Sequence, residues 1–333
     1  MYIIKYFVNL QRILYTMLLE IVIIIVCFAI VLWGADRFTD GSCGLARRLK
    51  VSELVIGLTV VSLGTSLPEF IVSFMSILRG SGDMSVGNVM GSNIFNILVI
   101  TGSAAIMRDL KIDGTILRRH FPVCFLASFL LFNFGYSEGK IQRWEGLGLV
   151  ILFCIYLYYN YLIALKDRKN SAEEHQGDEM SLLKSLGLIL VGMVALVAGG
   201  RVLVDNAASL AREMGVSESV IGLTILAGGT SLPELATSVI AARKGSFGLA
   251  LGNVLGSNIF NIAFVVGFCS SAVPMTVAEI TTIDWGMLVG SVALTWLVAW
   301  TGRNLQKKEG ILLVLCYLAY LVWLIMRSKQ GLT

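Results

Sequence analysis

Charged residues are scarce in this chain of 333 residues, because Asp, Glu, Lys and Arg together make up 14%. A soluble globular chain carries about 25%, whereas here 56% of the residues are hydrophobic and the mean hydropathy is +0.80. The net charge of +4 is too small and too dispersed to indicate nucleic-acid binding. The composition predicts a protein that resides in lipid.

Residues that hold transition metals are also sparse. The two histidines, His120 and His175, have no Cys or His neighbour at metal-ligand spacing, so the sequence argues against a zinc site. Six cysteines are scattered without a CxxC pair, and we expect them to be small buried apolar residues. The sequence indicates no resident cofactor.

Long apolar runs dominate what is present. Runs of about 20 residues suit membrane-spanning helices, and polar or Gly- and Pro-containing segments separate them. The sequence predicts an all-α polytopic membrane protein with ten transmembrane helices. These are expected at about 17–37, 51–78, 85–107, 120–136, 146–165, 182–211, 217–242, 248–273, 281–301 and 309–327.

The chain repeats itself at an offset of 165 residues. Residues 51–97 align with 216–262 without a gap, and 27 of these 47 positions are identical. The repeat predicts two five-helix halves, 17–165 and 182–327, joined by a polar linker at 166–181. Residues 1–16 have no counterpart and are either an N-terminal extension or untranslated sequence before Met17. We favour a retained first span over a signal peptide, because cleavage would remove the partner of the sixth span.

Five spans per half predict that the halves cross the membrane in opposite directions, as inverted repeats of secondary transporters do. Loop charge agrees with this expectation. The loops on one side hold Arg47, Arg48, Lys50, Arg108, Lys111, Arg118, Arg119, Lys166, Arg168, Lys169, Arg243, Lys244, Arg303, Lys307 and Lys308, and those on the other hold Arg79, Lys140, Arg143 and Arg212. The positive-inside rule then predicts a bacterial inner-membrane protein with a cytoplasmic linker and both termini outside.

Two of the four prolines recur inside the repeated hexapeptide GTSLPE, as Pro68 and Pro233. A proline within a span removes one backbone hydrogen bond and displaces the carbonyl four residues earlier, here that of Gly64 or Gly229. Freed carbonyls at membrane depth are tolerated where they line a cavity. A simple packing kink is the alternative, but a kink alone would not need the glutamate that follows.

Glu69 and Glu234 are the two acidic residues of these hexapeptides. A charged side chain at the bilayer centre costs about 2.5–3.5 kcal/mol or more, and two facing carboxylates would repel unless a cation lies between them. A protonated, hydrogen-bonded glutamate is the structural alternative. The oxygen-bearing residues beside them are Thr65, Ser66, Thr230 and Ser231.

The repeated segment GNVxGSNIFN adds further neutral oxygens. Ser92 and Asn96 share a helical face, as do Ser257 and Asn261, and Gly87/Gly91 and Gly252/Gly256 have the GxxxG spacing of closely packed helices. For Asn88, Asn93, Asn253 and Asn258, a packing role and a functional role are both open. The candidate ligands are all oxygens with two formal negative charges, which favours a hard cation such as Ca²⁺ or Na⁺.

With both copies of GTSLPE and GNVxGSNIFN in order, residues 17–327 resemble the calcium/cation antiporter superfamily, specifically its compact prokaryotic sodium/calcium exchangers. The resemblance implies that the second, third, seventh and eighth helices enclose a row of ion sites. Glu69 and Glu234 would hold Ca²⁺ with the carbonyls of Thr65 and Thr230, and Asn96 would line the central site. It places sodium ligands at Ser62, Ser66 and Ser92 in one half and at Ala227, Ser231 and Ser257 in the other.

The chain departs from this pattern at Asn261, where some sodium-coupled members have an aspartate. We hypothesise that the missing charge reduces the number of monovalent ions exchanged per Ca²⁺. The expected function is Ca²⁺/Na⁺ antiport, and the alternative is proton- or potassium-linked exchange through the same glutamates. An ion channel or an intramembrane enzyme fits less well, because the chain holds its own two-fold site and lacks GxSxG and HExxH motifs. Besides these cations and lipid, no obligate protein partner is evident.

Overall fold

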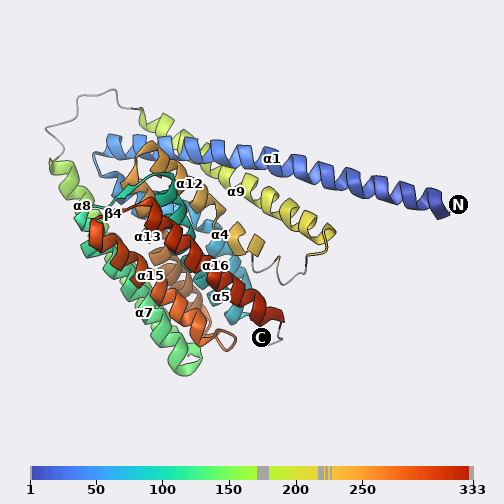
Figure 1. Cartoon of the computed structure of the whole chain (residues 1–333). Coiled ribbons are helices and arrows are strands. Elements are labelled where there is room, and N and C mark those ends of the chain that lie inside the picture. Colours follow the sequence, from blue (N-terminus) through green and yellow to red (C-terminus); the bar gives the residue numbers. More distant parts are fainter. Residues whose placement is uncertain (1, 171–179, 217–220, 222–223, 226, 330–333) are drawn as a thin grey trace.

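A computed structural model describes residues 2–170, 180–216, 221, 224–225 and 227–329. The described chain is almost entirely helical (Figure 1). Its first half contains α1 (Tyr2–Leu49), α2 (Glu53–Ile56), η1 (Gly57–Val61), α3 (Ser62–Thr65), α4 (Leu67–Leu78), α5 (Gly82–Phe95), η2 (Asn96–Ile100), α6 (Thr101–Met107), β1 (Leu110–Lys111), η3 (Ile116–His120), α7 (Phe121–Glu138), β2 (Lys140–Ile141) and α8 (Arg143–Asn170). Its second half contains α9 (Leu182–Glu213), α11 (Ala227–Gly229), α12 (Leu232–Lys244), α13 (Phe247–Ile259), η6 (Phe260–Val266), α14 (Gly267–Ala272), β3 (Met275–Thr276), α15 (Thr282–Gly302), β4 (Asn304–Leu305) and α16 (Lys307–Lys329). Elements labelled η are π-helical turns.

The described residues contain eight helices long and apolar enough to cross a membrane, and the bent pair Glu53–Thr65 and Leu67–Leu78 makes a ninth candidate. These nine coincide with nine of the ten expected spans. The remaining expected span, 217–242, begins in residues outside the described part and ends within α12. The count of ten therefore stays a prediction. Tyr2–Thr16, the expected extension, is helical and continuous with the rest of α1.

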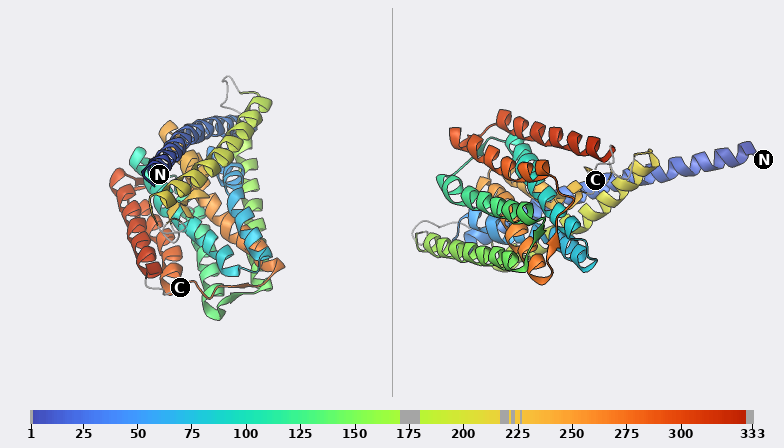
Figure 2. Two further views of the ribbon diagram at one scale, coloured as in Figure 1. Left: turned by 90° about the vertical axis from the view of Figure 1, so that its right-hand side faces the viewer. Right: turned by 90° about the horizontal axis from the view of Figure 1, so that it is seen from below.

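The helices form a buried centre and an outer layer whose surface is exposed. In the segment Phe247–Ala272, 94% of the most apolar window is buried, against 17% in α1 and in α16. Figures 1 and 2 show α1 and α9 running together along one side of the bundle, with the start of α1 extending beyond it. Apolar side chains exposed on α1, α8, α9 and α16 would face water in a soluble protein, so this surface suits lipid.

Glycines allow α1 and α9 to approach closely. A Cβ placed on Gly34 would lie 2.8 Å from the Cβ of Ala195, and one placed on Gly41 would lie 2.7 Å from the carbonyl oxygen of Ser185. As numbers rise along α1 they fall along α9, so the two repeat-related helices are antiparallel.

Glycines of α13 form a second close contact, with the first part of the bent helix. A Cβ on Gly252 would lie 2.8 Å from the carbonyl oxygen of Leu54, and one on Gly256 would lie 2.6 Å from Ser62 Oγ. The GxxxG prediction is confirmed for this pair. A Cβ on Gly87 or Gly91 would meet no atom within 4 Å in the described part of the chain, so their predicted contact is not found there.

Two short ribbons join loops of the two halves. Leu110 and Lys111 in β1 pair antiparallel with Leu305 and Asn304 in β4, and β2 pairs antiparallel with β3. Four of the six cysteines are buried as expected and Cys316 is partly buried, but Cys154 is exposed on α8, so the burial prediction was wrong for that residue. It lies on the apolar outer surface, where a small apolar side chain is stable in lipid.

Candidate cation site

The bent helix breaks at Ser66, whose backbone lies at φ −87° and ψ 9°. The axes of Glu53–Thr65 and Leu67–Leu78 differ by 46°. Ser231 has almost the same conformation, at φ −87° and ψ 8°, before α12. Proline occupies the first turn of the following helix in both copies, where its missing N–H removes no helical bond. Proline thus starts a new helix and places a glutamate in its first turn.

Glu69 and Glu234 are both completely buried, and each accepts a hydrogen bond from a serine of the other half. Ser66 Oγ donates to Glu234 Oε1 at 2.8 Å, and Ser231 Oγ donates to Glu69 Oε1 at 3.1 Å. Ser92 Oγ donates to the same Glu69 oxygen at 3.4 Å. The sequence did not predict that each serine bonds the glutamate of the other half. The 165-residue offset of the repeat was the signal that could have indicated it.

Two asparagines, Asn88 and Asn253, fix the backbone of the glutamates. Asn88 Nδ2 donates to the carbonyl of Glu69 at 3.3 Å, and Asn253 Nδ2 donates to that of Glu234 at 3.4 Å. Asn253 also accepts a bond from Thr65 Oγ1 at 3.1 Å. These contacts assign both residues a packing role, which the sequence had left open.

Four further asparagine side chains join the halves at the centre of the bundle. Asn93 Nδ2 donates to the carbonyl of Asn258 at 3.1 Å, and Asn258 Nδ2 donates to the carbonyl of Asn93 at 3.0 Å. Asn96 Nδ2 donates to Asn258 Oδ1, and Asn261 Nδ2 donates to Asn93 Oδ1, both at 3.1 Å. Each amide nitrogen is used within the protein, so the side-chain oxygens of Asn96 and Asn261 remain for another partner.

Several buried oxygens at this centre have no hydrogen-bond partner among the described residues. They are Glu69 Oε2, Glu234 Oε2, Asn96 Oδ1, Asn261 Oδ1, Thr230 Oγ1 and Ser257 Oγ. Leaving such atoms unsatisfied away from water is costly. All six are hard oxygen donors, two of them on carboxylates, so the set fits a dehydrated cation.

The remaining candidate residues are Ser62, Thr65 and Ala227. Ser62 is buried, but its hydroxyl donates to the Thr59 carbonyl at 3.3 Å and packs against Gly256. Its carbonyl accepts the Ser66 N–H at 3.1 Å, so not every carbonyl of this turn is freed. Thr65 lies at the break of the helix and is buried. Ala227 begins α11, and its side chain lies outside the described part.

The π-helical turns were not predicted from the sequence. Asn96 begins η2, Asn261 lies in η6, and η1 precedes Ser62. Such turns shift the hydrogen-bonding ladder by one residue and are frequent at functional sites. Apolar periodicity does not distinguish them from ordinary helix, which is why the sequence gave no sign of them.

Comparison with known proteins identifies the class. The model of the family described as sodium/calcium exchanger protein matches residues 19–162 and 184–326, so the chain belongs to the sodium/calcium exchanger family of membrane proteins. The two matched parts correspond to the two predicted halves. The antiporter resemblance inferred from the repeated motifs is thereby confirmed.

Individual relatives agree over most of their length. Inner membrane protein YrbG of Escherichia coli is 34% identical over 318 residues, which cover 93% of this chain and 97% of that protein. Sodium/calcium exchanger MaX1 of Methanosarcina acetivorans is 30% identical over 327 residues, covering 87% of this chain and 93% of the relative. A solved structure of the sodium-calcium exchanger NCX_Mj matches with a TM-score of 0.79 and 31% identity, covering 92% of this chain and 99% of the other.

Proposed function

We propose that the chain exchanges Ca²⁺ for Na⁺ by alternating access, with Glu69 and Glu234 as the central cation ligands. The observation that carries the proposal is the reciprocal pair of serine–glutamate bonds beside unsatisfied, buried carboxylate oxygens. Two carboxylates balance one Ca²⁺ or a set of monovalent ions. Because empty carboxylates are costly to carry through a low-dielectric interior, one cargo must replace the other.

The remaining ligands are proposed from the same surroundings. Asn96 and Asn261 offer neutral oxygens toward the centre, and Thr65 and Thr230 lie at the two helix breaks. Ser66, Ser92 and Ser231 donate hydrogen bonds to the carboxylates, and Ser257 Oγ is buried without a partner among the described residues. We propose these four serines as sodium ligands, together with Ser62 and Ala227. The donors are neutral or anionic oxygens, which suit hard cations and lack the soft sulfur or imidazole ligands that favour Zn²⁺ or Cu²⁺.

Contacts between the halves support an inverted arrangement of the two repeats. Helices α1 and α9 are antiparallel, whereas the segment 53–65 and α13 run in parallel, and opposite insertion of two five-span repeats requires both relationships. The β1–β4 ribbon joins two loops predicted to be cytoplasmic, and β2–β3 joins two predicted to lie outside. The start of α1 and the end of α16 lie toward the same end of the bundle (Figures 1 and 2), as an even number of spans demands. We therefore propose an inner-membrane orientation with both termini outside.

Proton- or potassium-linked exchange is the alternative, because Asn261 leaves two carboxylates at the centre. MaX1 and NCX_Mj, whose names are those of sodium/calcium exchangers, favour sodium. A relative from mouse, named sodium/potassium/calcium exchanger 2, is 28% identical over 175 residues. Its name is the reason to test potassium-linked exchange as well. The ion dependence of flux separates these readings.

The decisive experiment measures radioactive Ca²⁺ uptake into proteoliposomes loaded with Na⁺ and diluted into Na⁺-free buffer. We expect uptake in the wild type, none with Glu69→Gln or Glu234→Gln, and normal uptake with Glu53→Gln, which alters a carboxylate at the far end of the bent helix. Uptake driven by a pH gradient instead would assign the protein to proton-linked exchange. Uptake that survives both central substitutions would refute the proposed ligands.

A further inference from the structure

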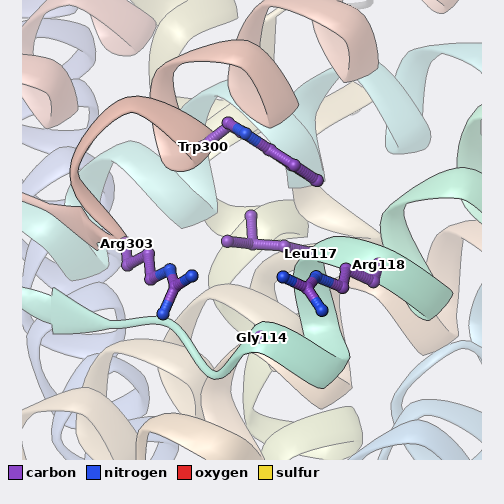
Figure 3. Close-up of a pocket in the computed structure, with 5 residues that line it drawn as sticks. All are labelled: Gly114, Leu117, Arg118, Trp300 and Arg303. Carbon is purple, nitrogen blue, oxygen red and sulfur yellow. The ribbon is translucent and has the colours of Figure 1, made fainter.

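A pocket of about 200 Å³ lies away from the cation site, between the start of the η3–α7 helix and the end of α15. Gly114, Leu117, Arg118, Trp300 and Arg303 line it, and we call it the arginine pocket. In Figure 3 the side chains of Arg118 and Arg303 come from opposite sides and point their guanidinium groups toward one another. Trp300 lies across from Gly114, on the other side of the pocket.

The walls of the arginine pocket are fixed by contacts between the two halves of the chain. Trp296 Nε1 donates to the carbonyl of Leu117 at 2.9 Å, and the N–H of Ile112 donates to the carbonyl of Arg303 at 3.0 Å. The β1–β4 ribbon adds a further contact here, because β1 lies just before Gly114 and β4 follows Arg303 directly. The fold therefore fixes the backbone on both sides of the pocket, and the side chains of Arg118 and Arg303 are exposed at its mouth.

Arg303 has a left-handed backbone, at φ 48° and ψ 24°. Glycine would adopt this conformation without strain but would carry no charge. Strained positions of this kind point to function when the surroundings enforce them. Arg303 ends α15 as its C-cap, a place where helices commonly adopt this conformation, and its guanidinium group points into the pocket (Figure 3).

Neighbouring arginines use their charge within the protein, whereas these two do not. Arg108 donates to the carbonyl of Arg243 at 3.1 Å, and Arg119 lies over the ring of Tyr159 at 5.9 Å. Among the residues that the structure describes, no hydrogen bond or ion pair involves the guanidinium group of Arg118 or of Arg303. The nearby carboxylate of Asp113 accepts the N–H of Thr115 at 2.8 Å. Water and salt screen part of the repulsion between these two exposed cations, and an anion bound between them would remove the rest.

We propose that the arginine pocket binds the phosphate of an anionic phospholipid headgroup. Guanidinium groups match phosphate with paired hydrogen bonds. Trp300 is half exposed at the end of a span, where tryptophan is typical of the boundary between lipid and water. The pocket lies on the side predicted to be cytoplasmic, where basic pockets between helices meet anionic headgroups. A bound lipid would bridge α7 of one half and α15 of the other.

The test titrates short-chain phosphatidylglycerol into the full-length protein in detergent and follows bound lipid by native mass spectrometry. Parallel titrations use short-chain phosphatidylcholine and inorganic phosphate. We expect the wild type to prefer phosphatidylglycerol, and Arg118→Gln/Arg303→Gln to bind it at least about tenfold more weakly, because two charged hydrogen-bonding groups are lost. The matched control Arg119→Gln removes one charge from the same turn and should bind as the wild type does.

Three results would overturn the proposal. The double variant could bind phosphatidylglycerol as tightly as the wild type, or Arg119→Gln could weaken binding equally, which would show a diffuse charge effect. Inorganic phosphate could compete fully, which would make this a site for free anions. The wild-type preference between the two lipids needs no variant, so equal binding of both would refute the proposal even if the variants fail to fold.

Discussion

Ser66 Oγ donates to Glu234 Oε1 across the two halves of the chain at 2.8 Å, although 168 residues separate them in sequence. The equivalent bond from Ser231 to Glu69 is 3.1 Å long. Each helix break therefore supplies a carboxylate to one half of the site and a hydroxyl to the other. A movement of one half relative to its partner must change both bonds together, which couples the two repeats at the site.

Removing either hydroxyl should weaken cation binding in a similar way. We expect Ser66→Ala and Ser231→Ala each to lower the apparent affinity for the transported cations at least about tenfold, because a hydrogen bond to a charged group contributes about 1.5–3 kcal/mol. Concentration dependence of Ca²⁺ uptake into proteoliposomes measures this. Ser76→Ala is the control, since Ser76 Oγ bonds the Val72 carbonyl of its own helix. Equal affinities for all three variants would contradict a shared site.

Restoring a third carboxylate should change the ion stoichiometry. We expect Asn261→Asp to increase the current carried per Ca²⁺, because the added charge needs a further monovalent ion to balance it. Wild-type exchange should carry little or no current. The comparison is made by recording current and Ca²⁺ flux on the same membranes, with Asn261→Ser as a control that removes the amide without adding charge. A strongly electrogenic three-for-one exchange by the wild type would refute the hypothesis.

Close packing of α1 on α9 should depend on Gly192. A Cβ at this position would lie 2.6 Å from the backbone nitrogen of Phe38 and 2.7 Å from the carbonyl oxygen of Gly34. We expect Gly192→Ala to destabilise the protein by about 1–3 kcal/mol through overpacking. Gly187, in the same helix, has open space around it, so Gly187→Ala should be neutral or slightly stabilising. Thermal unfolding in detergent compares the two, and equal melting temperatures would contradict the packing argument.

Lys244 should hold the end of α1 against α12. Its Nζ lies 2.7 Å from Asp36 Oδ1 and 2.6 Å from Asp40 Oδ1. Because these groups are about one-third exposed, we expect Asp40→Asn to cost no more than about 1 kcal/mol and to speed amide hydrogen exchange near the end of α1.

The repeat provides the control for this ion pair. Asp205 is the counterpart of Asp40, but it lies 3.9 Å from Arg201 of its own helix and is largely exposed. Asp205→Asn should leave exchange in α1 and α9 unchanged. If both substitutions loosen α1 alike, the effect is one of overall charge and not of the contact with α12.

The sequence by itself determined the class of structure and the chemistry of the centre. Long apolar runs are not stable in contact with water, so they indicated a membrane protein. The duplicated GTSLPE and GNVxGSNIFN segments located the helix breaks, the buried glutamates and their neutral oxygens. Local sequence was sufficient for these predictions, because the glycine, proline and glutamate of each hexapeptide lie within six residues and affect the same part of the helix.

The tertiary structure decided how those turns meet. The crossing of Ser66 to Glu234, the reciprocal bonds of Asn93 and Asn258, and the approach of Arg118 to Arg303 all join residues more than 160 positions apart. The π-helical turns likewise depend on packing, because their apolar pattern is that of any buried helix. Side-chain partners across the bundle are set by helix direction and close glycine contacts, neither of which a one-dimensional pattern contains.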